Sequence, residues 1–233
     1  MKLSIIIPVF NEEKTITEIM ERVKVADIPV DKEIIIIDDG STDGTREKLK
    51  NINGVKIILH KINQGKGAAV ITGIKEAQGE YIIIQDADLE YDPNDIKKLL
   101  QPILENKTKV VYGTRLKRMP NFSKEERTFQ FLSHYIGNRF LSLVTSVLYG
   151  QWLTDMETCY KLFPRKAFID HKLNARGFEL EPEITAKLLK MGYKILEVPI
   201  TTKPRGYDEG KKLHTIRDGS KALFSLIKYR FYD

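Results

Sequence analysis

Three carboxylates occupy alternate positions in the segment "QDADLEYDP", which directly follows an apolar run. If strand geometry continued beyond that run, Asp86, Asp88 and Glu90 would share one side of the chain, because residues two apart in an extended segment point the same way. Their mutual repulsion would then cost stability unless a cation lay between them. Carboxylate oxygens suit Mg²⁺ or Mn²⁺, and such an ion commonly keeps waters and binds a diphosphate as well. The alternative is a polar loop in which the acids point into water, so the surrounding sequence has to decide.

The first hundred residues alternate between two periodicities. Short runs rich in Ile and Val are typical of strands buried on both faces, and the stretches between them are typical of helices. This alternation predicts an α/β fold with a mostly parallel sheet and right-handed crossovers. The predicted strands are residues 3–9, 33–38, 55–59, 81–85 and 109–113, and the predicted helices are residues 15–25, 45–50, 67–78 and 94–105.

Polar segments follow the first four predicted strands and would meet at one edge of this sheet. They read "PVFNEE", "DDGSTDGT", "NQGKGAA" and "DADLE". In open α/β sheets, ligands bind beyond the carboxyl ends of the strands. Four such segments at one edge therefore predict a binding site there more strongly than any single segment does.

Three positions at this edge carry individual predictions. We expect Asp43 or Ser41 to cap the helix that begins at Thr45, which would leave Asp39 free to accept from a ribose hydroxyl or a base N–H. The glycines around Lys66 lack the spacing of an ATP-binding P-loop, so they indicate at most a helix start close to a nucleotide. Arg115 ends the fifth predicted strand, where a guanidinium can pair with phosphate oxygens in a forked geometry.

The composition excludes several other function classes. Of 233 residues, 42% are hydrophobic and 30% charged, which is ordinary for a soluble globular protein. Cys159 is the sole cysteine, so no intramolecular disulfide or cysteine zinc cluster forms, and a reducing cytoplasm is expected. The net charge of +6 favours anionic partners, but the basic segments lack the interleaved aromatic residues of a nucleic-acid binder. No apolar stretch approaches the ~20 residues of a membrane-spanning helix.

The second half is less regular and contains more apolar surface than one helix stripe requires. A helix is predicted over residues 129–149, whose apolar positions exceed a single face, and an amphipathic helix ends in "FSLIKYRFYD". A further helix near residues 183–191 and a strand over residues 194–198 lie between them. The excess apolar surface predicts burial against the sheet, a homodimer contact or a contact with anionic membrane. No interdomain linker is visible, so we predict one domain over residues 1–233.

Seven segments, taken in order, resemble the family 2 glycosyltransferases of GT-A fold, especially the polyprenyl-phosphate (dolichol-phosphate) sugar synthases. They read "SIIIPVFNEE", "EIIIIDDGSTDGT", "NQGKGAA", "DADLE", "VVYGTR", "TDMETCYK" and "GYKILEVPI". The resemblance implies a Rossmann-like sheet in which residues 1–113 bind a nucleotide sugar and residues 114–233 bind the acceptor. Implied nucleotide-binding residues are Pro8, Phe10, Glu12, Ile37, Asp39, Lys66 and Asp86. Asp86, Asp88 and Glu90 would surround Mg²⁺ or Mn²⁺ on the donor diphosphate, although dolichol-phosphate mannose synthases carry Gln in place of Glu90. Implied phosphate and acceptor contacts are Arg115, Arg127, Arg205 and Lys212.

The resemblance further implies an inverting transfer from a UDP- or GDP-sugar to dolichyl or undecaprenyl phosphate, with Asp88, Arg115 and Asp155 as catalytic residues. The enzyme would lie peripherally on the cytoplasmic face of a membrane. A phosphate acceptor is already anionic at neutral pH, since the second pKa of a monoester is near ~6, so no general base is needed. One alternative is transfer to a glycan hydroxyl, for which Asp155 or Glu157 would be the base. The other is a non-catalytic nucleotide-sugar-binding module on the same fold.

Overall fold

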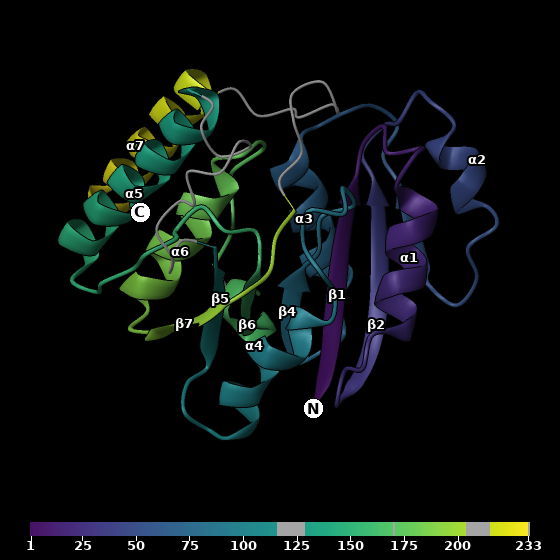
Figure 1. The fold of residues 1–233 in the computed structure, drawn as a ribbon, viewed down its shortest axis with the longest axis horizontal. Helices are drawn as coiled ribbons and strands as arrows, with labels where there is room; N and C mark the ends of the chain where they lie inside the picture. The colour runs from purple at the N-terminus through teal and green to yellow at the C-terminus, as the bar shows by residue number, and fades with distance from the viewer. Residues whose placement is uncertain (116–128, 170, 204–214, 233) are drawn as a thin grey trace.

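A seven-stranded sheet organises the computed structural model, which describes residues 1–115, 129–169, 171–203 and 215–232 (Figure 1). The strands lie in the order β3-β2-β1-β4-β6-β5-β7. Every neighbouring pair is parallel except the two pairs that β6 makes with β4 and β5. The strands are β1 Lys2–Val9, β2 Asp31–Asp38, β3 Lys56–Leu59, β4 Tyr81–Ile84, β5 Val110–Thr114, β6 Lys161–Pro164 and β7 Ile195–Pro199.

Seven α-helices accompany the sheet in the described ranges. They are α1 Ile16–Val25, α2 Thr45–Leu49, α3 Lys66–Glu76, α4 Asp95–Leu104, α5 Phe129–Tyr149, α6 Leu180–Lys190 and α7 Thr215–Phe231, and a 3₁₀ turn covers Arg165–Phe168. Every predicted strand and helix is present, with boundaries that differ by three residues or fewer. The predicted α/β class with a mostly parallel sheet is confirmed.

Strand β6 is the element that the sequence did not predict. It contains only four residues, begins with Lys161 and ends with Pro164, so neither alternation nor length marks it. Its backbone pairs on both sides, with β4 and with β5, and all four residues are buried. Pairing within the sheet, rather than local propensity, therefore defines this strand.

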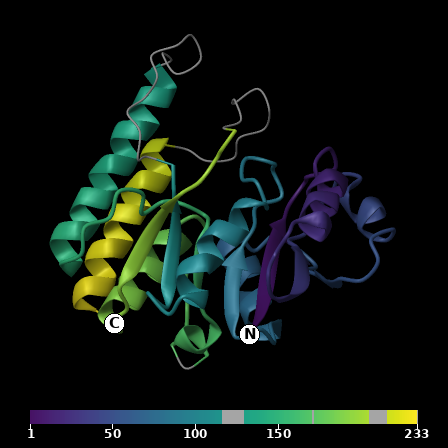
Figure 2. The ribbon, with the colours of Figure 1, turned by 60° about the horizontal axis from the view of Figure 1, so that its bottom comes forward.

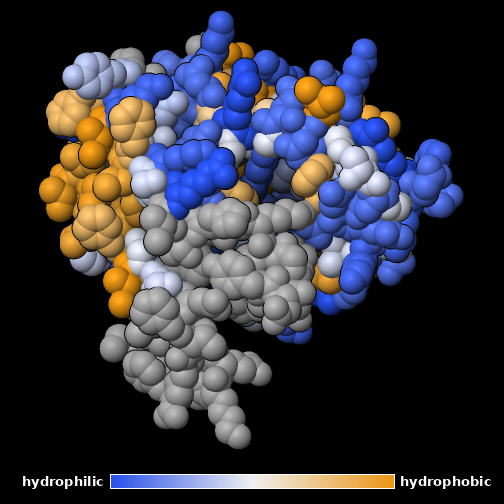
Figure 3. All heavy atoms as spheres, turned by 90° about the horizontal axis from the view of Figure 1, so that it is seen from above, coloured by the Kyte–Doolittle hydropathy of each residue, from blue (hydrophilic) through white to orange (hydrophobic). Residues whose placement is uncertain are grey.

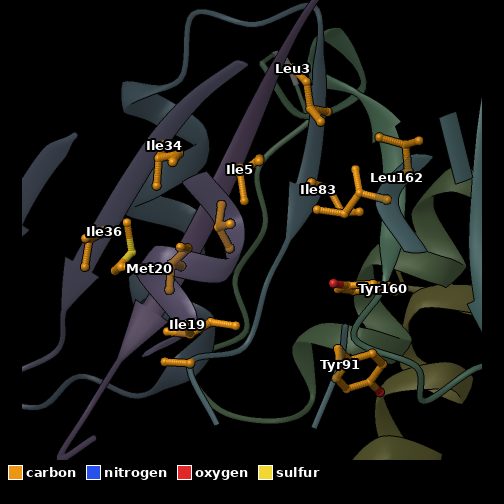
Figure 4. Packing of buried hydrophobic residues seen from close by; sticks show 14 of the residues in the cluster. Leu3, Ile5, Ile19, Met20, Ile34, Ile36, Ile83, Tyr91, Tyr160 and Leu162 are labelled. Carbon is orange, nitrogen blue, oxygen red and sulfur yellow. The ribbon is translucent and has the colours of Figure 1, made fainter. Parts of the chain in front are cut away.

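The two faces of the sheet bury alternate side chains of the same strands. Ile5 and Ile7 pack with α1 and α4, whereas Ile6, between them, packs with α3 and α6 on the opposite face. Figure 4 shows the first of these clusters, where Met20 of α1 approaches Ile36 of β2 and Tyr91 lies beside Tyr160. Because both faces are covered, the strands read as continuous Ile-rich runs.

Helices α5 and α7 form a further layer outside α6 (Figures 1 and 2). Leu141 of α5 and Leu226 of α7 meet in a small core with Met156. The outer side of the pair carries large exposed apolar side chains, and Figure 3 shows them gathered on one side of the molecule. We call this surface the α5–α7 face; its residues are Ile136, Phe140, Leu143, Val147, Phe224, Ile227 and Phe231. Among the described residues, no helix is both long and apolar enough to cross a membrane.

Candidate active site

The three acids after β4 do not continue the strand. β4 ends at Ile84, and the backbone turns at Leu89, whose φ is 64°. Asp88 Oδ1 accepts the Glu90 N–H at 3.1 Å, as an aspartate side chain does in a tight turn. The expectation that extended geometry aligns all three carboxylates is therefore wrong. In the ranges that the structure describes, no group of three or more His, Cys, Asp or Glu side chains is arranged to hold a metal ion.

Asp86 instead pairs with Lys66 at the start of α3. Lys66 Nζ lies 2.8 Å from Asp86 Oδ1 and 3.1 Å from Cys159 Sγ. Burial disfavours the charged carboxylate, but the Lys66 ammonium outweighs it and holds the pKa of Asp86 below its usual value. Burial and the Asp86 carboxylate raise the pKa of the Cys159 thiol well above its ordinary value, which rules against a nucleophilic thiolate.

A second buried carboxylate, Glu181 in the first turn of α6, lies on the other side of Lys66. Its Oε1 is 3.7 Å from Lys66 Nζ, and its Oε2 is 3.0 Å from Lys161 Nζ. Lys161 is completely buried and donates to the Met156 and Thr158 carbonyls. Lys66, Asp86, Lys161 and Glu181 thus form a connected set of two cations and two anions beside the end of β4.

Arg115 and Asp155 form a forked ion pair just beyond β5. Arg115 Nε and Nη2 donate to the two Asp155 oxygens at 2.8 Å each, and the Arg115 backbone N–H donates at 2.9 Å. The Asp155 side chain is fully buried. The backbone N–H groups of Thr154 and Asp155 donate in turn to Glu197 of β7, which fixes the segment before β6. Two of the predicted catalytic residues are therefore in direct contact.

The reversed direction of β6 explains why residues that precede a strand reach this edge. A parallel strand brings its carboxyl end here, but an antiparallel one brings its amino end. The segment over residues 154–160 therefore meets the segments that follow β4 and β5. Cys159 and Lys161 were missed because no local pattern reports the direction of a four-residue strand.

Asp39 is not free, contrary to the sequence-based expectation. Its carboxylate contacts His60 Nδ1 at 2.7 Å and accepts the backbone N–H groups of Gln64 and Gly65 at 3.0 and 2.7 Å. These partners belong to the segment after β3, which Asp39 thereby holds in place. The predicted cap by Asp43 or Ser41 is wrong, because Gly44 is the N-cap of α2 and no side chain caps it; Asp43, one residue earlier, accepts the Thr45 N–H instead.

The first amides of α3 are also occupied. Gly67 N donates to the Arg176 carbonyl at 2.8 Å, and Ala68 N does so at 3.3 Å. A Cβ on Gly65, whose φ is 98°, would come within 2.2 Å of that same carbonyl oxygen. The glycines therefore permit close packing against residues 175–177. A phosphate at this helix end would have to compete with a protein carbonyl, so Lys66 is the group that α3 contributes.

The remaining candidates divide into three groups. Pro8 and Phe10 lie at the end of β1 and are partly buried, and Glu12 is buried and accepts from the Thr15 hydroxyl. Ile37 is fully buried in the core against α3, so its side chain lies beneath the edge rather than on it. Arg127, Arg205 and Lys212 lie outside the described residues.

Asp86 and Asp88 offer carboxylate oxygens that fit Mg²⁺ or Mn²⁺, provided that a bound diphosphate completes the coordination. Mg²⁺ is commonly held by one or two carboxylates plus substrate phosphates rather than by a cage of protein ligands. The Lys66 ammonium at Asp86 shows that this position already favours a positive charge. The residues present therefore fit an ion shared with a ligand and do not form a closed three-acid site.

A mostly parallel sheet with one reversed strand, and acids and cations at its carboxyl edge, defines the GT-A class of glycosyltransferases. Glucosyl-3-phosphoglycerate synthase of Mycobacterium tuberculosis, crystallised with Mn²⁺, UDP and glucosyl-3-phosphoglycerate, has the same fold. The TM-score is 0.72 at 20% identity, and the match covers 98% of this chain and 79% of that chain. The sequence model of glycosyl transferase family 2 matches residues 4–171, and the chain belongs to that family.

Two archaeal relatives are similar over most of this chain. UDP-N-acetylglucosamine–dolichyl-phosphate N-acetylglucosaminyltransferase of Methanococcus voltae is 32% identical over 219 residues, which are 85% of this chain and 84% of that protein. Dolichol-phosphate mannosyltransferase of Pyrococcus furiosus is 30% identical over 237 residues, which are 98% of this chain and 64% of that protein. The resemblance inferred from the motifs is confirmed, and the protein is a glycosyltransferase.

Proposed function

We propose that this glycosyltransferase moves a sugar, with inversion, from a UDP- or GDP-sugar to a polyprenyl phosphate. The observation that carries the proposal is the forked pair between Arg115 and Asp155 at the carboxyl end of β5. Both oxygens of Asp155, one of the two carboxylates that the hydroxyl mechanism could use as a base, already accept from Arg115. The two archaeal relatives, whose names specify dolichyl phosphate or dolichol phosphate, support the same acceptor class.

On the donor side, Asp86 and Asp88 would hold Mg²⁺ or Mn²⁺ against the diphosphate. The bound ion would neutralise the charge that builds on the departing nucleoside diphosphate. Lys66 lies at Asp86 and adds a second positive charge at the same place. Pro8, Phe10, Glu12 and Asp39 remain the candidates for base and ribose contacts, with Asp39 acting partly through the segment that it holds.

On the acceptor side, a phosphate oxygen would attack the anomeric carbon without prior loss of a proton. Arg115 retains donors beyond the two bonds to Asp155, since a guanidinium carries five N–H groups. It would orient the acceptor phosphate while Asp155 fixes the guanidinium plane. Alignment of nucleophile and leaving group then supplies much of the rate enhancement.

The α5–α7 face would place the enzyme on an anionic membrane, where a polyprenyl phosphate resides. Helices α5 and α7 together contain five basic residues and one acidic residue, so the apolar surface is accompanied by positive charge. An apolar helix face with neighbouring Lys and Arg suits the headgroup region of such a membrane. Burial in a homodimer is the competing explanation of this face.

Glu157 gives specific support to a second candidate, transfer to a glycan hydroxyl. Burial raises the pKa of Glu157 to about 7, which suits a general base near neutral pH. Its neighbours Lys161 and Arg115 only partly offset the effect of burial.

A donor screen that follows nucleoside diphosphate release tests the proposal. We expect turnover that requires a polyprenyl phosphate, requires Mg²⁺ or Mn²⁺ and is abolished by a chelator. Asp88→Asn should abolish turnover and leave the unfolding transition unchanged. Turnover with soluble glycans but not with polyprenyl phosphate would reject the proposed acceptor, and full activity with chelator would reject the metal.

A further inference from the structure

Glu181 is a buried carboxylate with no hydrogen-bond donor for either oxygen among the described residues. The residue is only 3% exposed. Lys161 and Lys66 lie 3.0 and 3.7 Å away, but neither ammonium points at an oxygen in hydrogen-bonding geometry. Buried polar groups in folded proteins nearly always have such partners, and a carboxylate that lacks them is costly.

Glu183, two residues further along α6, shows what a structural carboxylate looks like in this protein. Its oxygens accept the Asn174 and Ala175 N–H groups at 2.7–3.0 Å, and Lys187 lies 3.1 Å away. Glu183 is as deeply buried as Glu181 and has the same chemistry. The difference between the two is that every oxygen of Glu183 has a donor within the protein.

The two lysines balance the charge of Glu181, but neither supplies a hydrogen bond to its oxygens. Lys66 already contacts Asp86 at 2.8 Å, and Lys161 already donates to the Met156 and Thr158 carbonyls. A second unsatisfied oxygen, Glu157 Oε1, belongs to a side chain close enough to interact electrostatically with Glu181. Three carboxylate oxygens from two segments therefore lack donors in one small region.

We propose that Glu181, with Glu157 beside it, accepts hydrogen bonds from hydroxyl groups of the transferred sugar. The inference rests on the proposed function, because it assigns the sugar-binding part of the same donor site. Hydroxyl groups supply the O–H donors that these oxygens lack, whereas the ionised oxygens of a diphosphate can only accept hydrogen bonds. The sugar would lie on the Glu181 side of Lys66, and the diphosphate would lie on the Asp86 side. Glu181 then helps to decide which sugar the enzyme accepts.

Calorimetric titration with matched ligands tests this role. UDP is compared with UDP-glucose and UDP-N-acetylglucosamine, and GDP with GDP-mannose, each with Mg²⁺. A bond to a charged acceptor contributes enough that Glu181→Gln should weaken binding of the nucleotide sugar roughly 10-fold or more and leave binding of the nucleoside diphosphate unchanged. Glu183→Gln is the matched control: it removes a carboxylate with partners, so it should lower the midpoint of thermal unfolding without changing the ratio of the two affinities.

Deoxy donors keep the test independent of whether Glu181→Gln folds. In the unaltered protein, a donor lacking the recognised hydroxyl should bind about 10-fold more weakly, and a donor lacking another hydroxyl should bind normally. In Glu181→Gln the first loss should largely disappear. An unchanged ratio of nucleotide-sugar to nucleoside-diphosphate affinity in Glu181→Gln, or equal binding of all deoxy donors, overturns this inference but leaves the proposed function standing. Failure of the unaltered protein to bind any nucleotide sugar or nucleoside diphosphate overturns the proposed function as well.

Discussion

The forked pair of Arg115 and Asp155 should couple strongly, and a double-mutant cycle measures how strongly. The pair has two hydrogen bonds of 2.8 Å between the side chains and a third from the Arg115 backbone. Asp155 is 0% exposed and the Arg115 side chain is 23% exposed. The three proteins to compare with the unaltered one are Asp155→Asn, Arg115→Met and the double variant.

The expected energies follow from this burial. Removing one partner of a buried ion pair leaves an uncompensated charge and costs about 3–5 kcal/mol, whereas replacing both is often nearly neutral. Arg115→Met strands the more deeply buried charge, so it should lie at the upper end of that range. Asp155→Asn should lie at the lower end, because the exposed part of Arg115 can still be hydrated. The double variant is not a hydrophobic replacement, because the amide introduced by Asp155→Asn still lacks the donors of Arg115, so it should cost about 5 kcal/mol. The coupling free energy, which is the two single costs less the cost of the double variant, should therefore be about 3 kcal/mol.

Urea unfolding of the four proteins gives the coupling directly, provided that the dependence on denaturant concentration stays the same. Glu47 and Lys50 supply the control, because their nitrogen–oxygen distance is also 2.8 Å but their side chains are 73% and 68% exposed. That pair should couple by only about 0.3–0.5 kcal/mol. Equal coupling in the two pairs would refute the argument that burial makes the difference.

The pH–rate profile of Asp155→Asn tests the role of Asp155 separately. With a phosphate acceptor, the acid limb of the profile should be retained in this variant, and loss of the acid limb would show that Asp155 acts as a base.

Two further predictions concern Glu157 and the α5–α7 face. The pKa of Glu157 is about 7 in the folded protein against an ordinary value of 4.5, so the unfolded chain releases this proton at lower pH and stability should fall as pH rises from 4.5 to about 7. Glu157→Gln should remove this decrease in the free energy of unfolding, which amounts to at most about 3 kcal/mol. Unfolding of both proteins measured at pH 4.5 and pH 7 checks the prediction, and the same pH dependence in the two proteins would contradict the assignment to Glu157. Val147→Glu and Phe224→Glu, both at exposed positions, should each weaken flotation with anionic vesicles, whereas Val25→Glu on α1 should not. Equal flotation of the three variants would reject the membrane contact. So would a dimer in solution that Val147→Glu and Phe224→Glu dissociate and Val25→Glu does not.

The strands were predictable because burial on both faces forces a visible pattern. Ile5, Ile6 and Ile7 each meet a core, so the run is apolar throughout, and the same holds in β2. β6 lacks this signal because its position depends on two partners that lie far away in the sequence. Strand direction alone predicted which edge of the sheet gathers the polar residues. The ion pair between Asp86 and Lys66 lies at that edge.

Side-chain geometry at that edge was less predictable. The alignment of three acids failed because a turn at Leu89 intervenes, and a residue with positive φ other than Gly leaves little trace in a sequence. Asp39 appeared free because its partners come from the segment after β3, which no local rule connects to it. Glu181 was missed because its neighbours, Lys66 and Lys161, lie on two other elements.

The position of β6 also restricts how the enzyme can move. The strand hydrogen-bonds to β4, which leads to the donor acids, and to β5, which leads to Arg115. Donor and acceptor sides therefore share one continuous sheet, and a hinge between them would have to break backbone pairs within it. Enzymes built from two lobes can close by rotating one lobe against the other. In this protein the distance between the sugar and its acceptor would instead be set by side chains and connecting segments at the edge of one rigid sheet. Substitutions in the core of the sheet should therefore lower stability before they change the order of substrate binding.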